Sequence, residues 1–411
     1  MPTINAGDTA WMLVSTALVM LMTPGLAFFY GGMVRRKNTL STIMMSFMTL
    51  GLISVLWVIY GYSLSFGSGG GGFIGGFNYV GLHNVGQDPS SIYATTIPHL
   101  AFSAYQMMFA IITVALITGA VVERVKFSAI FIFAAIWFTV VYIPVAHWVW
   151  SSDGWLFKMG VLDFAGGTVV HITAGVSALS LAMVLGPRKD FQLKTPMAPA
   201  NIPFVVIGAS LLWFGWFGFN AGSALTAGGL SSNAFMATNT AAATAALTWM
   251  FLSWFFHRPT ITGMATGAVA GLVAITPAAG FVTPMMGIPI GIGVSLICFF
   301  MMRLRGRSKM DDSLDVFACH GMGGTWGALA TGIFASAAVN SAGADGLIHG
   351  NWMLLGKQAL AVAVVWAFSF CMTWIIGKVL DKTIGLRVNQ TEESLGLDIS
   401  QHGESAYGDE L

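Results

Sequence analysis

Apolar runs of about 20 residues recur along the whole of this 411-residue chain, separated by polar connections. A run of that length crosses the roughly 30 Å hydrocarbon core of a bilayer as an α-helix. Because a helix satisfies its backbone polar groups within its own segment, the pattern predicts an all-α polytopic membrane protein. We expect eleven transmembrane helices, at about residues 9–31, 39–65, 101–122, 127–148, 164–186, 200–222, 234–256, 261–281, 285–302, 316–337 and 353–380.

Composition supports this class. Hydrophobic residues make up 56% of the chain and charged residues only 9%, against about 25% charged in soluble domains. The net charge of +1 gives no reason to expect a nucleic-acid partner, and the three cysteines indicate no disulfide framework. The first residues lack the charged region and cleavage pattern of a signal peptide, so we expect none. The longest connection, about 66–100, is glycine-rich and is predicted to be irregular and flexible.

The basic residues predict the orientation. Sixteen of the eighteen lysines and arginines lie on one side of this topology, and only Lys158 and Lys357 lie on the other. Positive charge concentrates on the cytoplasmic side of membrane proteins. We therefore expect a multi-pass protein of the plasma (cytoplasmic) membrane with the N-terminus outside. Residues 1–380 form the transmembrane domain, and residues 381–411 form a polar cytoplasmic tail too short for an added catalytic domain.

Two histidines lie in corresponding places of two halves. His171 falls in the fifth span and His320 in the tenth. Spans one to five and six to ten can be read as two repeats of five spans each. Because five is odd, the second repeat then crosses the membrane in the opposite orientation to the first. Inverted repeats with a site near the midplane are a common transporter design. We expect pseudo-repeats at about 9–186 and 200–337, followed by one extra C-terminal helix at 353–380.

An ionisable group inside a membrane span is costly and marks a functional site by default. Gly167 and Gly175 lie four residues before and after His171, and Gly324 and Gly327 lie four and seven residues after His320, so both faces allow close packing. The alternative is two separate histidines, each hydrogen-bonded by its neighbours. A metal usually needs three or four ligands, which this region does not offer. A proton relay, or a polar lining for a small neutral molecule, suits two imidazoles better.

Aromatic residues and one serine occupy the outer ends of several spans. Tyr105 and Phe109 share a helix face in the third span, Phe219 and Ser223 share one in the sixth, and Trp150 closes the fourth. Aromatic faces attract cations by ~0.5–2 kcal/mol each, and a hydroxyl adds an acceptor. For any one of these residues taken alone, an interfacial aromatic belt or an ordinary lipid-facing position is the favoured explanation.

Four stretches resemble the Amt/Mep/Rh ammonium transporter family, and most of all its bacterial Amt branch. They are residues 24–32 (PGLAFFYGG), 163–171 (DFAGGTVVH), 213–223 (WFGWFGFNAGS) and 315–324 (DVFACHGMGG). The resemblance covers nearly the whole chain. It implies that the chain is not an enzyme, that it needs no cofactor or metal, and that it forms homotrimers with a pore in each subunit. A PII signal protein is an expected partner at the cytoplasmic face, and methylammonium an expected second substrate.

The resemblance also implies residue roles. Trp150 and Ser223 favour the Amt branch, and Tyr105 stands where the family usually has Phe. The matches are an outer recruitment site (Trp150, Tyr105, Phe109, Ser223), a stacked pair closing the pore mouth (Phe109, Phe219), twin pore histidines (His171, His320) and an orienting carboxylate (Asp163).

The expected mechanism follows from the free energy needed to move a charged or a neutral molecule into the apolar pore. Moving a bare cation into an apolar pore costs on the order of 20 kcal/mol by the idealised Born estimate. Ammonium has a pKa of about 9, so neutral ammonia lies only ~3 kcal/mol higher at pH 7. We expect deprotonation near the Phe pair, passage of ammonia along the histidines, and net electrogenic uptake. The competing functions are an ammonium sensor or signalling receptor, and a passive channel for ammonia or carbon dioxide.

Overall fold

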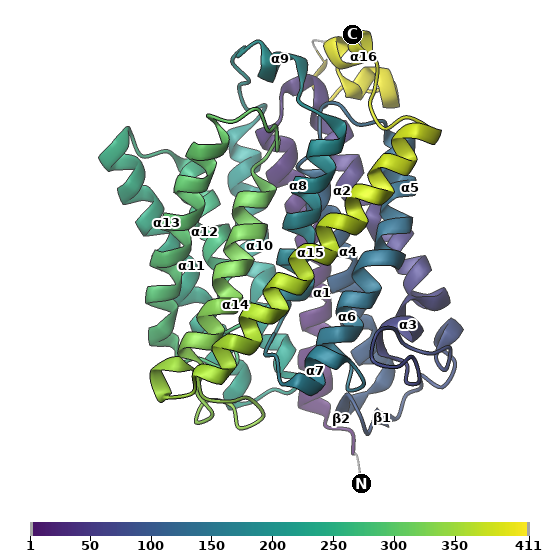
Figure 1. The fold of residues 1–411 in the computed structure, drawn as a ribbon, viewed down its shortest axis with the longest axis vertical. Helices are drawn as coiled ribbons and strands as arrows, with labels where there is room; N and C mark the ends of the chain where they lie inside the picture. The colour runs from purple at the N-terminus through teal and green to yellow at the C-terminus, as the bar shows by residue number, and fades with distance from the viewer. Residues whose placement is uncertain (1–2, 409–411) are drawn as a thin grey trace.

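A computed structural model describes residues 3–408 of the chain. Its helices run between two ends of the molecule, with the N-terminus at one end and the C-terminal segment at the other (Figure 1). The first half contains α1 (Ala6–Met33), α2 (Thr39–Leu56), α3 (Tyr62–Phe66), α4 (His99–Thr118), α5 (Phe127–Trp137), α6 (Ile143–Trp150), α7 (Trp155–Met159), the π-helical segment η5 (Gly167–Ile172), α8 (Thr173–Leu185) and α9 (Lys189–Gln192).

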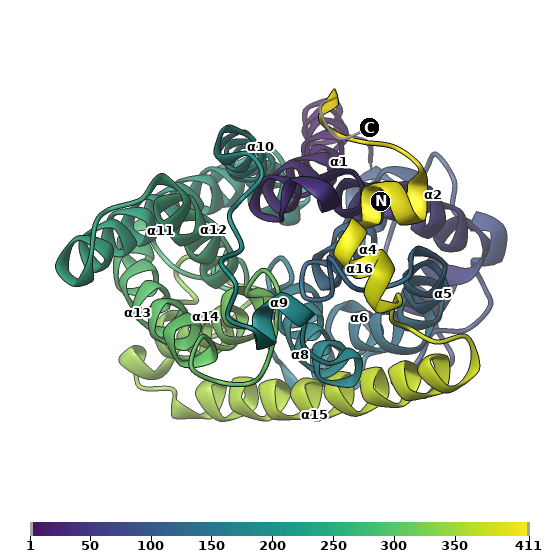
Figure 2. The same ribbon diagram turned by 90° about the horizontal axis from the view of Figure 1, so that it is seen from above.

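The second half begins after a connection at residues 193–201. It contains α10 (Ile202–Ala221), α11 (Gly229–Phe256), α12 (Ile261–Ile275), α13 (Gly287–Arg305), the π-helical segment η8 (Phe317–Met322) and α14 (Gly323–Phe334). The long α15 (Trp352–Thr383) lies along one side of the helix bundle (Figure 2). The tail then forms α16 (Gln390–Leu395) and a last π-helical turn (Asp398–His402).

The prediction of a helical membrane protein is confirmed. Within residues 3–408, eight helical segments are long and apolar enough to cross a membrane. Helices also occupy the other three predicted positions, namely α11, the shorter apolar α12, and η8 with α14. Length and hydropathy thus support eight crossings, and the count of eleven stays a prediction.

Two predictions about connections need correction. The third span ends at Thr118, not near residue 122, and a turn follows in which Glu123 has the left-handed φ of 69°. The connection at 66–100 is not wholly irregular, because β1 (Pro89–Ser90) and β2 (Ala94–Pro98) form a short antiparallel hairpin. A two-residue strand leaves almost no alternation to detect in the sequence.

The opening helices of the two halves, α1 and α10, pack at very short range. A Cβ added at Gly208 of α10 would lie 2.3 Å from the backbone nitrogen of Phe29 in α1. Another added at Gly32 would lie 2.6 Å from the carbonyl oxygen of Asn201. Small residues permit such close approach between membrane helices, where no hydrophobic force drives association. The glycines of the first and sixth spans therefore join the two predicted halves.

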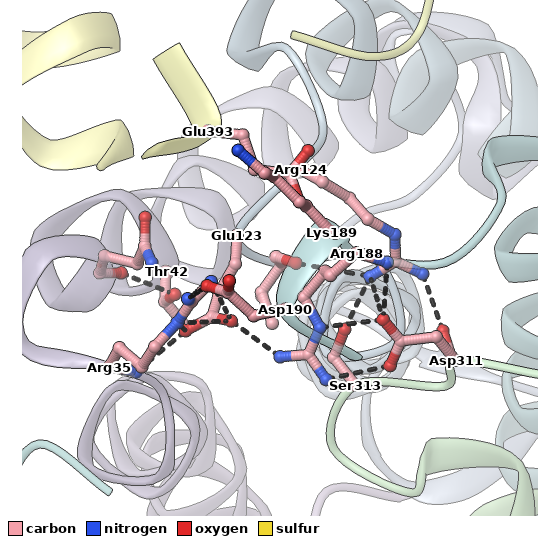
Figure 3. A network of polar contacts seen from close by, with 12 residues as sticks. Arg35, Thr42, Glu123, Arg124, Arg188, Lys189, Asp190, Asp311, Ser313 and Glu393 are labelled. Carbon is pink, nitrogen blue, oxygen red and sulfur yellow. Dashed lines mark hydrogen bonds and ion pairs between the residues drawn. The ribbon is translucent and has the colours of Figure 1, made fainter. Parts of the chain in front are cut away.

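A buried ion-pair network ties together the connections at the end of the molecule that carries the tail (Figure 3). Glu123 accepts from Arg35 at 3.0 Å and from Arg188 at 2.6 Å. Arg188 also reaches Asp311 at 2.8 Å, and Arg124 donates to the Asp311 carbonyl at 2.6 Å. Although burial raises the pKa of the Glu123 carboxyl, the guanidiniums of Arg188 and Arg35 lower it overall to about 2.

The tail is joined to the same end of the molecule. The Glu393 carboxylate accepts from the backbone N–H of Lys189, at the start of α9, at 2.8 Å, and pairs with Arg387 at 2.7 Å. Further along, the carboxylate of Asp398 accepts from the N–H groups of Leu40 and Ser41 in the first turn of α2, at 3.0 and 2.7 Å. These anions stabilise two helix N-termini while holding the tail in place.

Candidate functional site

Each histidine lies on a π-helical turn, a geometry that is rare and often found at functional sites. His171 lies in η5, and the Asp163 carboxylate caps that segment. The carboxylate oxygens accept from the four backbone N–H groups of residues 166–169, at 2.7 to 3.0 Å. Each carboxylate oxygen of Asp163 therefore already accepts two hydrogen bonds from the helix backbone. This arrangement matches an orienting role and leaves Asp163 little capacity to bind a substrate directly.

Asp312 caps the second π-helical turn, and the sequence analysis missed it. Its carboxylate accepts from the N–H groups of Val316 and Phe317 at 3.1 and 2.7 Å. Asp312 precedes His320 by eight residues, as Asp163 precedes His171. That equal spacing was the available signal in the sequence. Asp315 instead has a left-handed φ of 57° and pairs with Arg305.

The two histidine-bearing segments cross at glycines. A Cβ added at Gly175 would lie 2.0 Å from the backbone nitrogen of Gly321, and one at Gly324 would lie 3.0 Å from the Cβ of His171. The close approach predicted for both faces is therefore confirmed. Helix α8 ends near α9, whereas α14 ends at the opposite end of the molecule (Figure 1). The two segments run in opposite directions, as inverted halves require.

The crossing brings the two imidazoles together. Nδ1 of His171 and Nδ1 of His320 are 3.2 Å apart, and the ring centroids are 5.2 Å apart. Both side chains are buried, and Nε2 of His171 has no hydrogen-bond partner among the described residues. When both rings are neutral, one ring donates its Nδ1–H to Nδ1 of the other. The donating ring then has an unprotonated Nε2 that can accept a hydrogen bond, and the accepting ring has its proton on Nε2 and can donate one. The pair therefore presents one donor and one acceptor at its free nitrogens.

A chain of aromatic rings leads from the histidines toward the N-terminal end of α4. Phe219 lies 6.0 Å from His171 and 4.3 Å from Phe109, measured between ring centroids. Phe109 meets Trp150 edge to face at 5.6 Å and Tyr105 at 4.9 Å. Phe109 and Phe219 are fully buried, and this pair lies between the outer residues and His171 in the chain of ring contacts.

The outer group is held by backbone contacts. Trp150 donates from Nε1 to the Asp163 carbonyl at 3.0 Å, which links it to the start of η5. Ser223, in a short 3₁₀ turn after α10, donates to the Phe219 carbonyl at 2.8 Å. Contacts thus link Trp150 to Phe109, Phe109 to Tyr105 and the Tyr105 hydroxyl to Ser223, although three different spans carry these residues.

The Tyr105 hydroxyl was expected to offer an acceptor to a cation. It is instead buried against the end of α10, 2.8 Å from the carbonyl oxygens of both Gly218 and Phe219 and 3.2 Å from the Ser223 hydroxyl. The ring of Tyr105 remains packed on Phe109. Tyr105 therefore contributes its ring to the outer group and uses its hydroxyl to fix the helix end that carries Ser223.

On the other side of the histidines, a cavity of about 310 Å³ extends toward the end that carries the tail. It begins at Phe219 and the two histidines and reaches Leu314 and Asp315. Its walls are mainly apolar, with Trp216, Leu116 and Met33 among them. Within the described residues, no three His, Cys, Asp or Glu side chains gather closely enough to hold a metal ion. The cavity fits a small neutral molecule better than a bare ion.

A family model, a related sequence and two solved structures all match this chain over nearly its whole length. Residues 10–407 match the model of the Ammonium Transporter Family. The chain is 51% identical to the ammonium transporter of Bacillus subtilis (strain 168) over 410 residues, covering 99% of this chain and 100% of that protein. The crystal structure of Candida albicans Mep2 matches with a TM-score of 0.90 at 38% identity, covering 99% and 92% of the two chains. A structure described as a sensor Amt protein matches with a TM-score of 0.87 at 29% identity, covering 96% and 98%.

Proposed function

This chain belongs to the ammonium transporter family and is an ammonium transporter, and on that premise we propose how it moves its substrate. Ammonium binds at the outer group formed by Trp150, Tyr105, Phe109 and Ser223. It loses a proton near the Phe109–Phe219 pair, and ammonia passes along His171 and His320 into the inner cavity. The net reaction is electrogenic uptake, with the proton crossing separately from ammonia.

The observation that carries the proposal is the unbroken order of these groups. Rings that attract a cation come first, a closed aromatic pair follows, and the hydrogen-bonded histidines come last at 3.2 Å. An isolated charge in such surroundings is strongly disfavoured, whereas a neutral amine only needs hydrogen-bond partners. Potassium has no proton to lose, so the same path excludes it.

The orientation and assembly belong to the same proposal. The tail end of the molecule carries the ion-pair network and most of the basic residues, which supports a cytoplasmic tail and an outer N-terminus in the plasma membrane. We further propose that the protein is a homotrimer and that a PII signal protein binds its cytoplasmic face. We also propose that the transmembrane domain ends near residue 380, close to the end of α15 at Thr383.

Current measurements on a solid-supported membrane test the transport cycle. Proteoliposomes pulsed with ammonium should give a transient current, and potassium pulses should give none. Replacing both His171 and His320 with apolar residues should abolish selective transport. Absence of any ammonium current, together with alkalinisation of the lumen, would show neutral ammonia passage instead. Unchanged selectivity against potassium in the double variant would exclude a role for the histidines in proton transfer.

A sensing function is the second candidate, favoured by the likeness to the sensor Amt structure and by the docked tail. A sensor would bind ammonium without sustained flux. Methylammonium accumulation in cells that lack other ammonium transporters separates the two. Concentrative uptake supports transport, whereas binding without accumulation supports sensing.

A further inference from the structure

Helix α15 stands outside the two halves, yet one of its side chains reaches the segment that carries Asp163. The helix runs along one side of the bundle, from the end that holds the N-terminus to the end that holds the tail (Figure 1). Gln358 lies in its second turn and is 1% exposed. The nearby Met353 and Leu360 are 51% and 45% exposed, so they mark the outward face of the same helix. Gln358 is therefore a buried carboxamide that points into the protein.

The carboxamide of Gln358 pairs with the backbone of Leu162 as a neighbouring strand would. The Leu162 N–H donates to Oε1 of Gln358 at 2.9 Å, and Nε2 of Gln358 donates to the Leu162 carbonyl at 2.8 Å. Nε2 also donates to the carbonyl of Ala328 in α14, at 3.1 Å. Both donors of the carboxamide are thus used. One side chain thereby joins the segment before His171 to the helix that follows His320.

Leu162 lies in an irregular segment that does not supply these hydrogen bonds itself. Residues 161–166 connect α7 to η5 and belong to no helix or strand. Buried backbone groups in such a segment need partners from elsewhere. Leu162 takes both of its partners from Gln358, and the Phe164 N–H donates to the Pro277 carbonyl at 3.2 Å. These contacts fix the backbone on both sides of Asp163.

Asp163 passes this position on to two parts of the proposed path. Its carbonyl accepts from Nε1 of Trp150 at 3.0 Å, and its carboxylate caps η5 through four backbone N–H groups. The cap holds the carboxylate from the helix side, whereas the backbone before Asp163 depends on Gln358. Loss of the Gln358 carboxamide should therefore displace the Asp163 carbonyl, and with it the Trp150 indole, more than it disturbs the cap.

We propose that Gln358 is a positioning residue for ammonium binding, which fixes the Trp150 indole through the backbone of Leu162 and Asp163. The proposal rests on the proposed function, because it takes Trp150 as part of the outer ammonium site. It assigns a role in substrate affinity to α15, a helix that carries none of the residues of the outer group. Gln358 itself does not contact the substrate.

Methylammonium uptake by proteoliposomes that contain the full-length protein tests this role. Gln358→Met keeps the length of the side chain and removes the carboxamide. We expect the apparent KM to rise by about 3- to 10-fold and the maximal rate to fall by less than about 2-fold, because the change weakens substrate binding more than the later steps.

Thr373→Val is the matched control. Thr373 lies further along α15, is also buried, and accepts from Nε1 of Trp137 at 3.0 Å while it donates to Ser177 at 2.8 Å. Both variants remove buried hydrogen bonds of the same helix, so both should lower the temperature of thermal unfolding. Only Gln358→Met should change the KM. A drop in stability in both variants with the KM unchanged in both would show that Gln358 has a structural role alone.

A double-variant cycle tests whether Gln358 acts through Trp150. In a Trp150→Phe background the indole N–H that bonds to the Asp163 carbonyl is absent. Adding Gln358→Met to that background should raise the KM little further, because the two changes affect one connection. Full additivity of the two KM changes would mean that Gln358 acts independently of Trp150, and the proposal would be wrong.

A milder variant serves if Gln358→Met does not fold. Gln358→Glu keeps an oxygen that accepts from the Leu162 N–H, and it should give a KM between those of the unaltered protein and Gln358→Met. An unchanged KM in Gln358→Glu, with both carbonyls deprived of their amide donor, would also contradict the positioning role. Absence of methylammonium uptake by the unaltered protein would overturn the proposed function together with this inference, whereas normal uptake with an unchanged KM overturns the inference alone.

Discussion

At the scale of single residues, the site depends on polar groups whose hydrogen bonds are almost all internal. The Asp163 carboxylate accepts hydrogen bonds from four backbone N–H groups, and the Tyr105 hydroxyl donates to a backbone carbonyl at the end of α10. Removing one partner of a buried hydrogen bond leaves the other unsatisfied at a cost of about 1–3 kcal/mol. Both residues therefore position backbone segments of the candidate site.

Asp163→Asn should damage both stability and transport. The amide replaces one accepting oxygen by an NH₂ group that faces two N–H donors, so the cap of η5 is partly lost. We expect a loss of about 2–4 kcal/mol in stability and a large drop in methylammonium uptake. Thermal unfolding in detergent and uptake in vesicles measure the two effects. Asp153→Asn is the control, since the Asp153 side chain is 37% exposed and pairs with Lys158 at the surface. Normal stability in Asp163→Asn would contradict the capping role.

Tyr105→Phe should weaken ammonium binding while retaining the ring. Loss of the hydroxyl frees the end of α10, so the Ser223 hydroxyl is no longer held in place. We expect the apparent KM to rise by about 3- to 10-fold with little change in maximal rate, equivalent to roughly 1 kcal/mol. The same substitution in a Ser223→Ala background should have little further effect. Full additivity of the two changes would mean that Tyr105 acts independently of Ser223.

At the scale of elements, the two histidines meet where two broken helices cross. The π-helical turns η5 and η8 begin with capped N-termini, and the segments that contain them run in opposite directions and cross where Gly175 of α8 meets Gly321 of η8. The crossing distance, more than any side-chain contact, sets the separation of the two imidazoles. A single methyl group at the crossing is therefore a sharp test.

Gly175→Ala should separate the histidines. The new Cβ would lie 2.0 Å from the Gly321 nitrogen, and backbone atoms cannot yield as a flexible side chain can. We expect a destabilisation of about 1–3 kcal/mol and loss of the 3.2 Å hydrogen bond, with transport falling accordingly. Gly51→Ala is the control, because nothing lies within 4 Å of its added Cβ in the middle of α2. That control should be neutral or stabilising by up to about 1 kcal/mol. A stable, fully active Gly175→Ala variant would refute the close crossing.

At the scale of the whole molecule, the buried ion-pair network joins the ends of α1, α4 and α8 to the connection before η8 (Figure 3). Breaking a buried pair by removing one partner costs about 3–5 kcal/mol, because the other charge is left unpaired. The network therefore holds the two halves in register at the tail end, as the α1–α10 contact does through the membrane.

Acid should weaken this network over a defined range. The pKa of Glu123 lies at about 2 in the folded protein, below its ordinary value of 4.5, so its stabilising effect is complete above pH 4.5. That effect, roughly 3 kcal/mol, is lost as the pH falls from 4.5 toward 2. Thermal unfolding between pH 6 and 2.5 should show the decline. Glu123→Gln should lower stability at neutral pH and flatten the decline, whereas Glu404→Gln, at an exposed position, should do neither.

Hydropathy and spacing are local properties of the chain, so the helical membrane class, the approximate helix positions and the matching places of His171 and His320 could all be predicted from the sequence. That two rings 149 residues apart lie within hydrogen-bond distance could be learned only from the folded protein. The same holds for Asp312 as the counterpart of Asp163 and for the Tyr105 hydroxyl, which turns toward the backbone. Those features depend on how helices cross and which face each turns inward, and packing between distant segments sets both.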